Sequence, residues 1–95
     1  MQTTFLVKIS EFCFHHNLEE SFIVTIESYD LIELIVMDDS KYIHQDHLPK
    51  LEKIIRLHNE LGINIEGIGA VLQLTDKIIE MQNEVVVLKN LLQNK

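Results

Sequence analysis

The stretch that decides the fold is Asp46–Gly62, with the sequence DHLPKLEKIIRLHNELG. Its apolar residues recur every three or four positions, which places them on one face of an α-helix. That expected buried stripe consists of Leu51, Ile54, Ile55 and Leu61, with Leu57 at its edge. Pro49 is compatible only with the first turn, where its missing N–H is not needed. Gly62 is typical of a helix end, so the stretch predicts a helix from Gln45 or Asp46 to Leu61.

The residues after this helix predict a short second one. Asn64 is a good N-cap, and the helical pattern continues from Ile65 to about Leu72. Gly67 and Gly69 lower the intrinsic stability of this segment, which indicates close packing against a neighbour.

The last segment has the spacing of a coiled coil. Apolar residues follow one another at intervals of 4, 3, 4, 3 and 4 positions, at Leu74, Ile78, Met81, Val85, Leu88 and Leu92. These six residues are called the seam below. Ile79, Val86 and Leu91 widen the stripe, as expected if one side packs on the domain and the other on a partner. The seam favours self-association as a homodimer over an intramolecular packing helix, and both interpretations stay open. Accordingly, we expect a body over residues 1–73 and a dimerisation or packing helix over residues 74–95, within one domain.

The N-terminal part predicts a strand followed by a helix. Thr3–Ile9 is rich in strand-forming residues, with apolar side chains alternating along it. Ser10 can cap the following helix, whose apolar face carries Phe12 and Cys13 and which ends near Asn17.

The region 18–37 is ambiguous from its residues alone. Phe22–Ile26 is rich in β-branched residues, as in a strand, yet its apolar residues also fit one face of a helix. Beyond it, Leu34–Met37 and Lys41–Ile43 flank the polar residues 38–40, a pattern that predicts a β-hairpin.

Charge is distributed unevenly along the chain. The net charge is −7, and the window from Ile9 to Ser40 contains no Lys or Arg. The acids of this window are Glu11, Glu19, Glu20, Glu27, Asp30, Glu33, Asp38 and Asp39. A protein that binds nucleic acid through phosphates needs the opposite sign of charge. The window is either a solvated acidic face or a surface that attracts a basic partner.

The sequence contains no strong catalytic or metal-binding motif. The single cysteine, Cys13, lies on an apolar helix face, which is more typical of packing than of a nucleophile. His44 and His47 are three positions apart but lack a metal-binding context, and His58 falls on a packing stripe. His15 and His16 are adjacent and point to different sides of a helix. We therefore expect neither enzymatic activity, nor a metal, nor a cofactor.

The sequence also predicts where the protein works. The N-terminal residues lack the basic and apolar regions of a signal peptide, and no apolar run is long enough to cross a bilayer. The expected location is the cytoplasm, with no membrane partner.

The order of expected parts resembles the MerR-like winged helix–turn–helix fold, which is mainly α with a small β wing and a C-terminal coiled-coil helix. Ile54–Ile63 (IIRLHNELGI) followed by Asn64–Ile68 (NIEGI) looks like the region after the wing. More specifically, Ile9–His15 (ISEFCFH), Arg56–Leu61 (RLHNEL) and Gly67–Leu74 (GIGAVLQL) are together similar to the chaperone-modulator CbpM family.

This resemblance implies that residues 19–29 form the second helix of the helix–turn–helix. It also implies a function, because members of that family bind the J-domain of a DnaJ-like co-chaperone, CbpA, and block its cooperation with DnaK. The expected electrostatic contacts are Glu19, Glu20, Glu27 and Asp30, facing the basic surface of the J-domain. The alternative is a MerR-like DNA-binding transcription regulator, for which the expected cations of the second helix and wing are missing. If the protein is instead a CbpM-like regulator, any contact with DNA is expected only through the co-chaperone partner.

Overall fold

The computed structural model describes residues 5–94 and begins with a strand, β1 (Leu6–Lys8), that leads directly into helix α1 (Ile9–His16). Ile9 therefore begins the helix instead of ending the strand, and Thr3 lies outside the described residues. The expectation that Ser10 caps α1 is wrong, because the residue before the helix is Lys8, which makes no side-chain capping bond. The helix ends as expected at Asn17, whose φ of 54° is left-handed.

The ambiguous region contains a helix, α2 (Glu20–Ser28), as the family resemblance implied, and the strand alternative is wrong. Ile23 and Ile26 are both fully buried on its inner side. Their spacing of three places them on one helical face. In a strand, a spacing of three would have placed them on opposite faces.

A three-stranded antiparallel sheet forms the wing, with the strand order β1-β3-β2. The predicted hairpin is confirmed as β2 (Ile35–Met37) and β3 (Ser40–His44). Asp38 and Asp39, which connect the two strands, have φ values of 50° and 61°. Two positive φ angles are characteristic of the type I′ turn, whose twist matches that of the strands, and Asp tolerates this conformation.

The central helix follows the wing through a short 3₁₀ turn, η1 (Gln45–His47), and runs as α3 (Leu48–Leu61). Pro49 lies in its first turn and Gly62 ends it with a φ of 67°, both as predicted. Leu51 and Ile54 are completely buried, but Leu61 is 67% exposed, so its place in the buried stripe is wrong. Leu61 is the last residue of α3 and lies beyond the core.

The C-terminal helix is continuous from Ile65 to Gln93, and we refer to it as α4 (Ile65–Gln93). The expected short helix ending near Leu72 is thus wrong as a separate element, because no glycine or proline follows Leu72 to end the helix there. Asn64 caps the helix as predicted, since its Oδ1 accepts a hydrogen bond of 2.7 Å from the N–H of Gly67.

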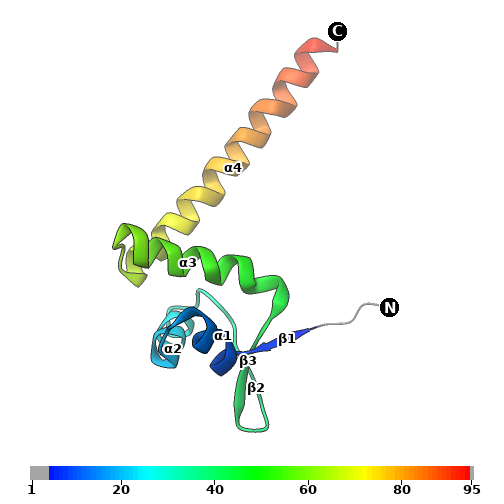
Figure 1. The fold of residues 1–95 in the computed structure, drawn as a ribbon. Coiled ribbons are helices and arrows are strands. Elements are labelled where there is room, and N and C mark those ends of the chain that lie inside the picture. Colours follow the sequence, from blue (N-terminus) through cyan, green and yellow to red (C-terminus); the bar gives the residue numbers. More distant parts are fainter. Residues whose placement is uncertain (1–4, 95) are drawn as a thin grey trace.

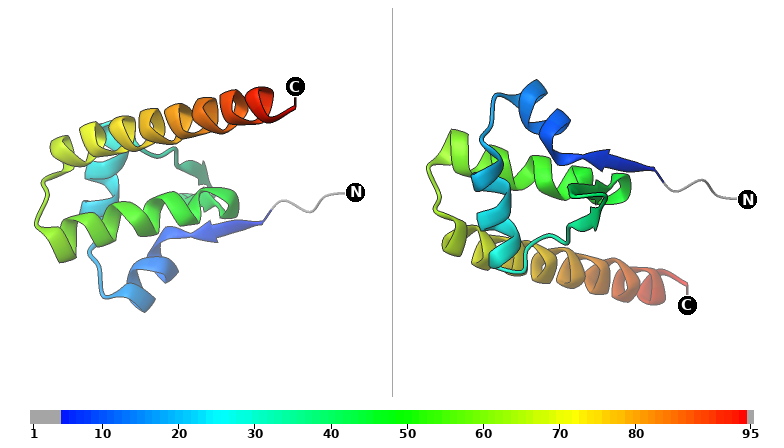
Figure 2. Two further views of the ribbon diagram at one scale, coloured as in Figure 1. Left: turned by 90° about the horizontal axis from the view of Figure 1, so that it is seen from above. Right: turned by 90° about the horizontal axis from the view of Figure 1, so that it is seen from below.

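The core lies between α1, α2, β3, α3 and the first turns of α4. Its fully buried large side chains are Ile9, Ile23, Ile26, Ile43, Leu51, Ile54 and Ile68. Figure 2 shows the start of α4 beside α2 and α3 at one side of the body. The rest of α4 projects away from the body, and the β2–β3 hairpin extends in the opposite direction (Figure 1). The fold is therefore mainly helical with a small wing, as the sequence predicted.

Candidate partner-binding surfaces

The four acids expected to contact a partner lie at the two ends of α2. Glu19 precedes the helix and Glu20 is its first residue, and both are exposed. Glu27 is half-buried in the last turn, and Asp30 is exposed just after the helix with a φ of 60°. A nine-residue helix is about 13 Å long. The four acids therefore form two pairs of carboxylates, one at each end of α2, separated by the length of the helix.

The outward face of α2 between these positions is neutral and rich in hydroxyl groups, a feature that the charge count missed. Thr25 Oγ1 donates a hydrogen bond of 2.8 Å to the carbonyl of Ser21, and Ser28 Oγ donates one of 2.6 Å to Thr25. Val24 is 38% exposed on the same side. Because these hydroxyls already bond to their own helix, the strongly polar groups of this surface are the flanking carboxylates.

None of the acids between residues 9 and 40 forms an ion pair within the described part of the chain. Across residues 5–94 the ion pairs are His44–Asp46 at 3.5 Å and Arg56–Glu60 at 3.9 Å. Within residues 5–94, no ion pair therefore neutralises the acidic window. Its carboxylates are free to interact with a cationic partner.

The seam residues of α4 are all exposed. From Leu74 to Leu92, every large apolar side chain, inside or beside the seam, is between 50% and 67% exposed. The intramolecular packing helix is therefore wrong for this part of α4. The expectation that one side of the stripe widened by Ile79, Val86 and Leu91 packs on the domain is also wrong, since all three are exposed. Despite its apolar face, no helix among the described residues is long and apolar enough to span a membrane.

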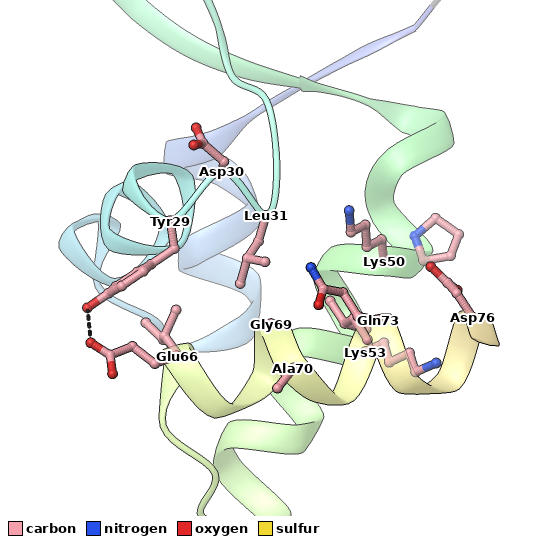
Figure 3. A pocket seen from close by; sticks show the side chains of 13 residues that line it. Tyr29, Asp30, Leu31, Lys50, Lys53, Glu66, Gly69, Ala70, Gln73 and Asp76 are labelled. Atoms are coloured by element: carbon pink, nitrogen blue, oxygen red, sulfur yellow. Dashed lines mark hydrogen bonds between the residues drawn. The ribbon is translucent and has the colours of Figure 1, made fainter. Parts of the chain in front are cut away.

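A groove lies where the segment after α2 meets α3 and α4, with a volume of about 890 Å³ (Figure 3). Tyr29 Oη donates a hydrogen bond of 3.3 Å to Glu66 Oε1 at one end of it. Lys50 and Lys53 from α3 line it together with Asp30, which forms no ion pair with either lysine. No local pattern of residues indicates the groove, because its walls come from segments far apart in the chain.

Cys13 and His58 occupy structural positions. Cys13 is 3% exposed, and its burial, with a smaller contribution from the charge of Glu20, raises the pKa of its thiol. A buried thiol with a raised pKa is a poor nucleophile. His58 is half-buried, as expected, and its Nδ1 lies 3.0 Å from the carbonyl oxygen of Ile63, to which it donates. No group of three or more potential metal ligands occurs among residues 5–94.

The wing carries exposed apolar side chains that sequence reasoning did not single out as a site. Ile35, Val36 and Met37 are 38%, 67% and 46% exposed, respectively. In DNA-binding proteins of the helix–turn–helix class, phosphate contacts depend largely on cationic and hydrogen-bonding side chains. The β2 strand presents no such side chain to a nucleic acid.

Comparisons with known proteins agree with this architecture. A family model described as "MerR HTH family regulatory protein" matches residues 7–90. The chaperone modulatory proteins CbpM of Escherichia coli O81 (strain ED1a) and Escherichia coli (strain UTI89 / UPEC) are each 27% identical to this chain over 77 residues. The matched residues make up 80% of this chain and 76% of each relative. No solved structure matches the chain significantly. The chain therefore belongs to the MerR helix–turn–helix family of regulatory proteins, and its resemblance to CbpM is confirmed.

Proposed function

We propose that this protein is a chaperone modulator that binds the J-domain of a DnaJ-like co-chaperone and blocks its cooperation with DnaK. The observation that carries the proposal is a helix–turn–helix and wing turn without a single Lys or Arg from Ile9 to Ser40. The CbpM-like resemblance implies a J-domain as the partner, and J-domains present a basic helix to DnaK. An acidic surface is complementary to that helix in charge and inhibits by occupying it.

The acidic positions at the ends of α2 contribute the electrostatic part of binding. Exposed ion pairs are individually weak, so these carboxylates steer and orient the partner more than they hold it. Affinity then depends on apolar contacts in addition to Glu19, Glu20, Glu27 and Asp30. No chemical step is involved in this mode of inhibition.

We also propose that the protein is a homodimer held by the seam. Support comes from the uninterrupted heptad spacing of the seam and from the exposure of all its residues in a single chain. A projecting apolar face of this size is unfavourable in water unless a second surface covers it. A second copy supplies a surface of the same spacing.

The proposed interface is tested by calorimetric titration with the purified J-domain of a DnaJ-like co-chaperone. Two double variants each reverse the charge at one end of α2. Glu19→Lys/Glu20→Lys changes its N-terminal end, and Glu27→Lys/Asp30→Lys changes its C-terminal end. The control, Glu52→Lys/Glu80→Lys, makes the same change in net charge on exposed positions of α3 and α4. We expect weaker binding and a shallower salt dependence for the α2 variants than for the control. Equal binding by all three variants would place the interface elsewhere.

The family also includes DNA-binding regulators, so DNA binding is the competing function. A gel-shift experiment with genomic fragments at low salt distinguishes the two. We expect no sequence-specific retention, because phosphate contacts need cations that α2 and the β2 strand lack. Specific retention without J-domain binding would favour a transcription regulator.

A further inference from the structure

The outward face of the wing is an apolar surface built from all three strands. In the register of the sheet, Tyr42 of β3 lies between Lys8 of β1 and Ile35 of β2. Since side chains alternate along a strand, Met37 shares this face with Ile35, whereas Val36 and the fully buried Ile43 belong to the opposite, inner face. Ile35 and Met37 are 38% and 46% exposed, and Tyr42 is half-buried between the neighbouring strands.

Carboxylates border this apolar face. A hollow of about 320 Å³ is lined by Ile35 and His44 of the outward face together with Glu33, Asp46 and His47, and Asp46 Oδ2 lies 3.5 Å from His44 Nδ1. At the other end of β2, the turn carries Asp38 and Asp39, which are both exposed. Lys8 is the one Lys or Arg on the outward face within the described residues. The face is therefore apolar at its centre and predominantly acidic at its ends.

We infer that this outward face of the wing is the apolar part of the J-domain interface, and that it packs against the apolar side of a basic, amphipathic helix of the partner. The inference rests on the proposed function and adds to it a surface beyond α2. Ile35, Met37 and Tyr42 make the apolar contacts. Glu33 and Asp46 receive a Lys or Arg of the same helix at the hollow.

The dimensions and charge of the face fit this occupant better than the alternatives. Neighbouring strands are about 4.8 Å apart, so three strands present a face about 10 Å wide, which matches the diameter of one α-helix. Nucleic acid is disfavoured because the bordering carboxylates repel phosphates. A second copy of the wing would bring carboxylate groups of like charge together.

The test compares the two faces of the same strand in binding to the purified J-domain. The double variant Ile35→Thr/Met37→Thr removes apolar groups from the outward face. The control Val36→Thr changes a side chain on the opposite face of the same strand; Val36 is nevertheless the most exposed residue of β2, at 67%. Threonine preserves the strand preference in both variants. We expect the double variant to bind about tenfold more weakly than the wild type and the control to bind within about twofold.

A crosslinking experiment gives a second readout that does not depend on the stability of the double variant. A photo-reactive benzoylphenylalanine replaces Tyr42 on the outward face or Lys41 on the inner face, in the full-length chain. Crosslinks to the J-domain from position 42 but not from position 41 support the inference. Equal affinities of all variants, or crosslinks from position 41 alone, overturn the wing surface while leaving the proposed function intact. A wild-type protein that does not bind the J-domain overturns the proposed function itself, and this docking surface with it.

Discussion

The body and the projecting half of α4 use similar amino acids but have opposite exposure. In the body, the isoleucines at positions 9, 23, 26, 43, 54 and 68 are at most 1% exposed. Beyond Leu72, the isoleucines, valines and leucines of α4 are at least 50% exposed. Burial is therefore decided by whether another surface lies within reach. A helix of 29 residues is about 43 Å long, which exceeds what the small body can cover.

The body and the projecting half of α4 are stabilised by different interactions. Packing within one chain stabilises the body, so its stability should not depend on protein concentration. The outer part of α4 has only its own hydrogen bonds, and most helical stability in proteins comes from packing of an apolar face. The helical structure of this outer part should therefore depend on a bound partner and on the protein concentration.

The largest expected effect tests the body. Ile54→Ala removes a fully buried side chain from the centre of α3 and leaves a cavity among the core residues. We expect a loss of about 2–5 kcal/mol in the free energy of unfolding, measured by urea denaturation. The control Leu61→Ala truncates the 67% exposed leucine of the same helix and should change stability by less than about 0.5 kcal/mol. Similar losses in both variants would mean that the body is not packed as described.

The second prediction tests the projecting half. Met81→Lys/Val85→Lys places two charges in the middle of the seam, where burial against a second copy would be strongly unfavourable. Sedimentation equilibrium should show dimers for the wild type and monomers for the variant, with the body still folded.

The matched control for the seam is Asn83→Lys/Asn90→Lys, which adds the same charge at exposed positions of α4 outside the seam. This control should remain dimeric. A wild type that is monomeric at every concentration, or a seam variant that still dimerises, would contradict the homodimer.

The third prediction concerns the junction between the two regions. Asn64→Ala removes the side chain whose Oδ1 accepts from the N–H of Gly67 at 2.7 Å and caps α4. Loss of an N-cap costs about 1 kcal/mol. Thermal unfolding should show a correspondingly lower Tm, while Asn59→Ala, an exposed substitution inside α3, should not lower it. An unchanged Tm for Asn64→Ala would mean that the cap does not contribute to stability.

The smallest expected effect compares the two glycines at the start of α4. A Cβ on Gly69 would lie 3.5 Å from Leu31, an ordinary contact, so Gly69→Ala should stabilise the helix by about 0.5–1 kcal/mol. A Cβ on Gly67 would lie only 2.9 Å from Ile63 Cγ2, and Gly67→Ala should not show this gain. Urea denaturation of both variants measures the difference, and an equal gain at both positions would contradict the close packing at Gly67.

Most elements of the fold were predictable from local sequence signals. Pro49 and Gly62 mark the two ends of α3, and Asn64 marks the start of α4, because each residue satisfies a backbone requirement of its own position. The identity of α2 was not predictable from propensity, since Phe22–Ile26 suits a strand and a helix equally. The helix allows Ile23 and Ile26 to be buried in the core on one face. Only the family resemblance predicted that this segment is a helix.

The candidate surfaces were predictable only in part. Counting charges identified the acidic window, and the heptad spacing identified the seam, because both are properties of the residues themselves. Three features could not be predicted from the sequence: the separation of the four acids to opposite ends of α2, the neutral face between them and the apolar face of the wing. They depend on which side of each element faces the core.

The sequence by itself determined the residues that begin and end helices, the turn between β2 and β3, the sign of the charge and the spacing of the seam. These are local properties, set by backbone geometry and by the period of an apolar pattern. Only the tertiary structure decided that α4 is continuous, that Leu61 and the seam are exposed, and that Ile35 and Met37 face outward beside carboxylates. Exposure is a property of what surrounds a side chain, and those surroundings are assembled from segments far apart in the chain.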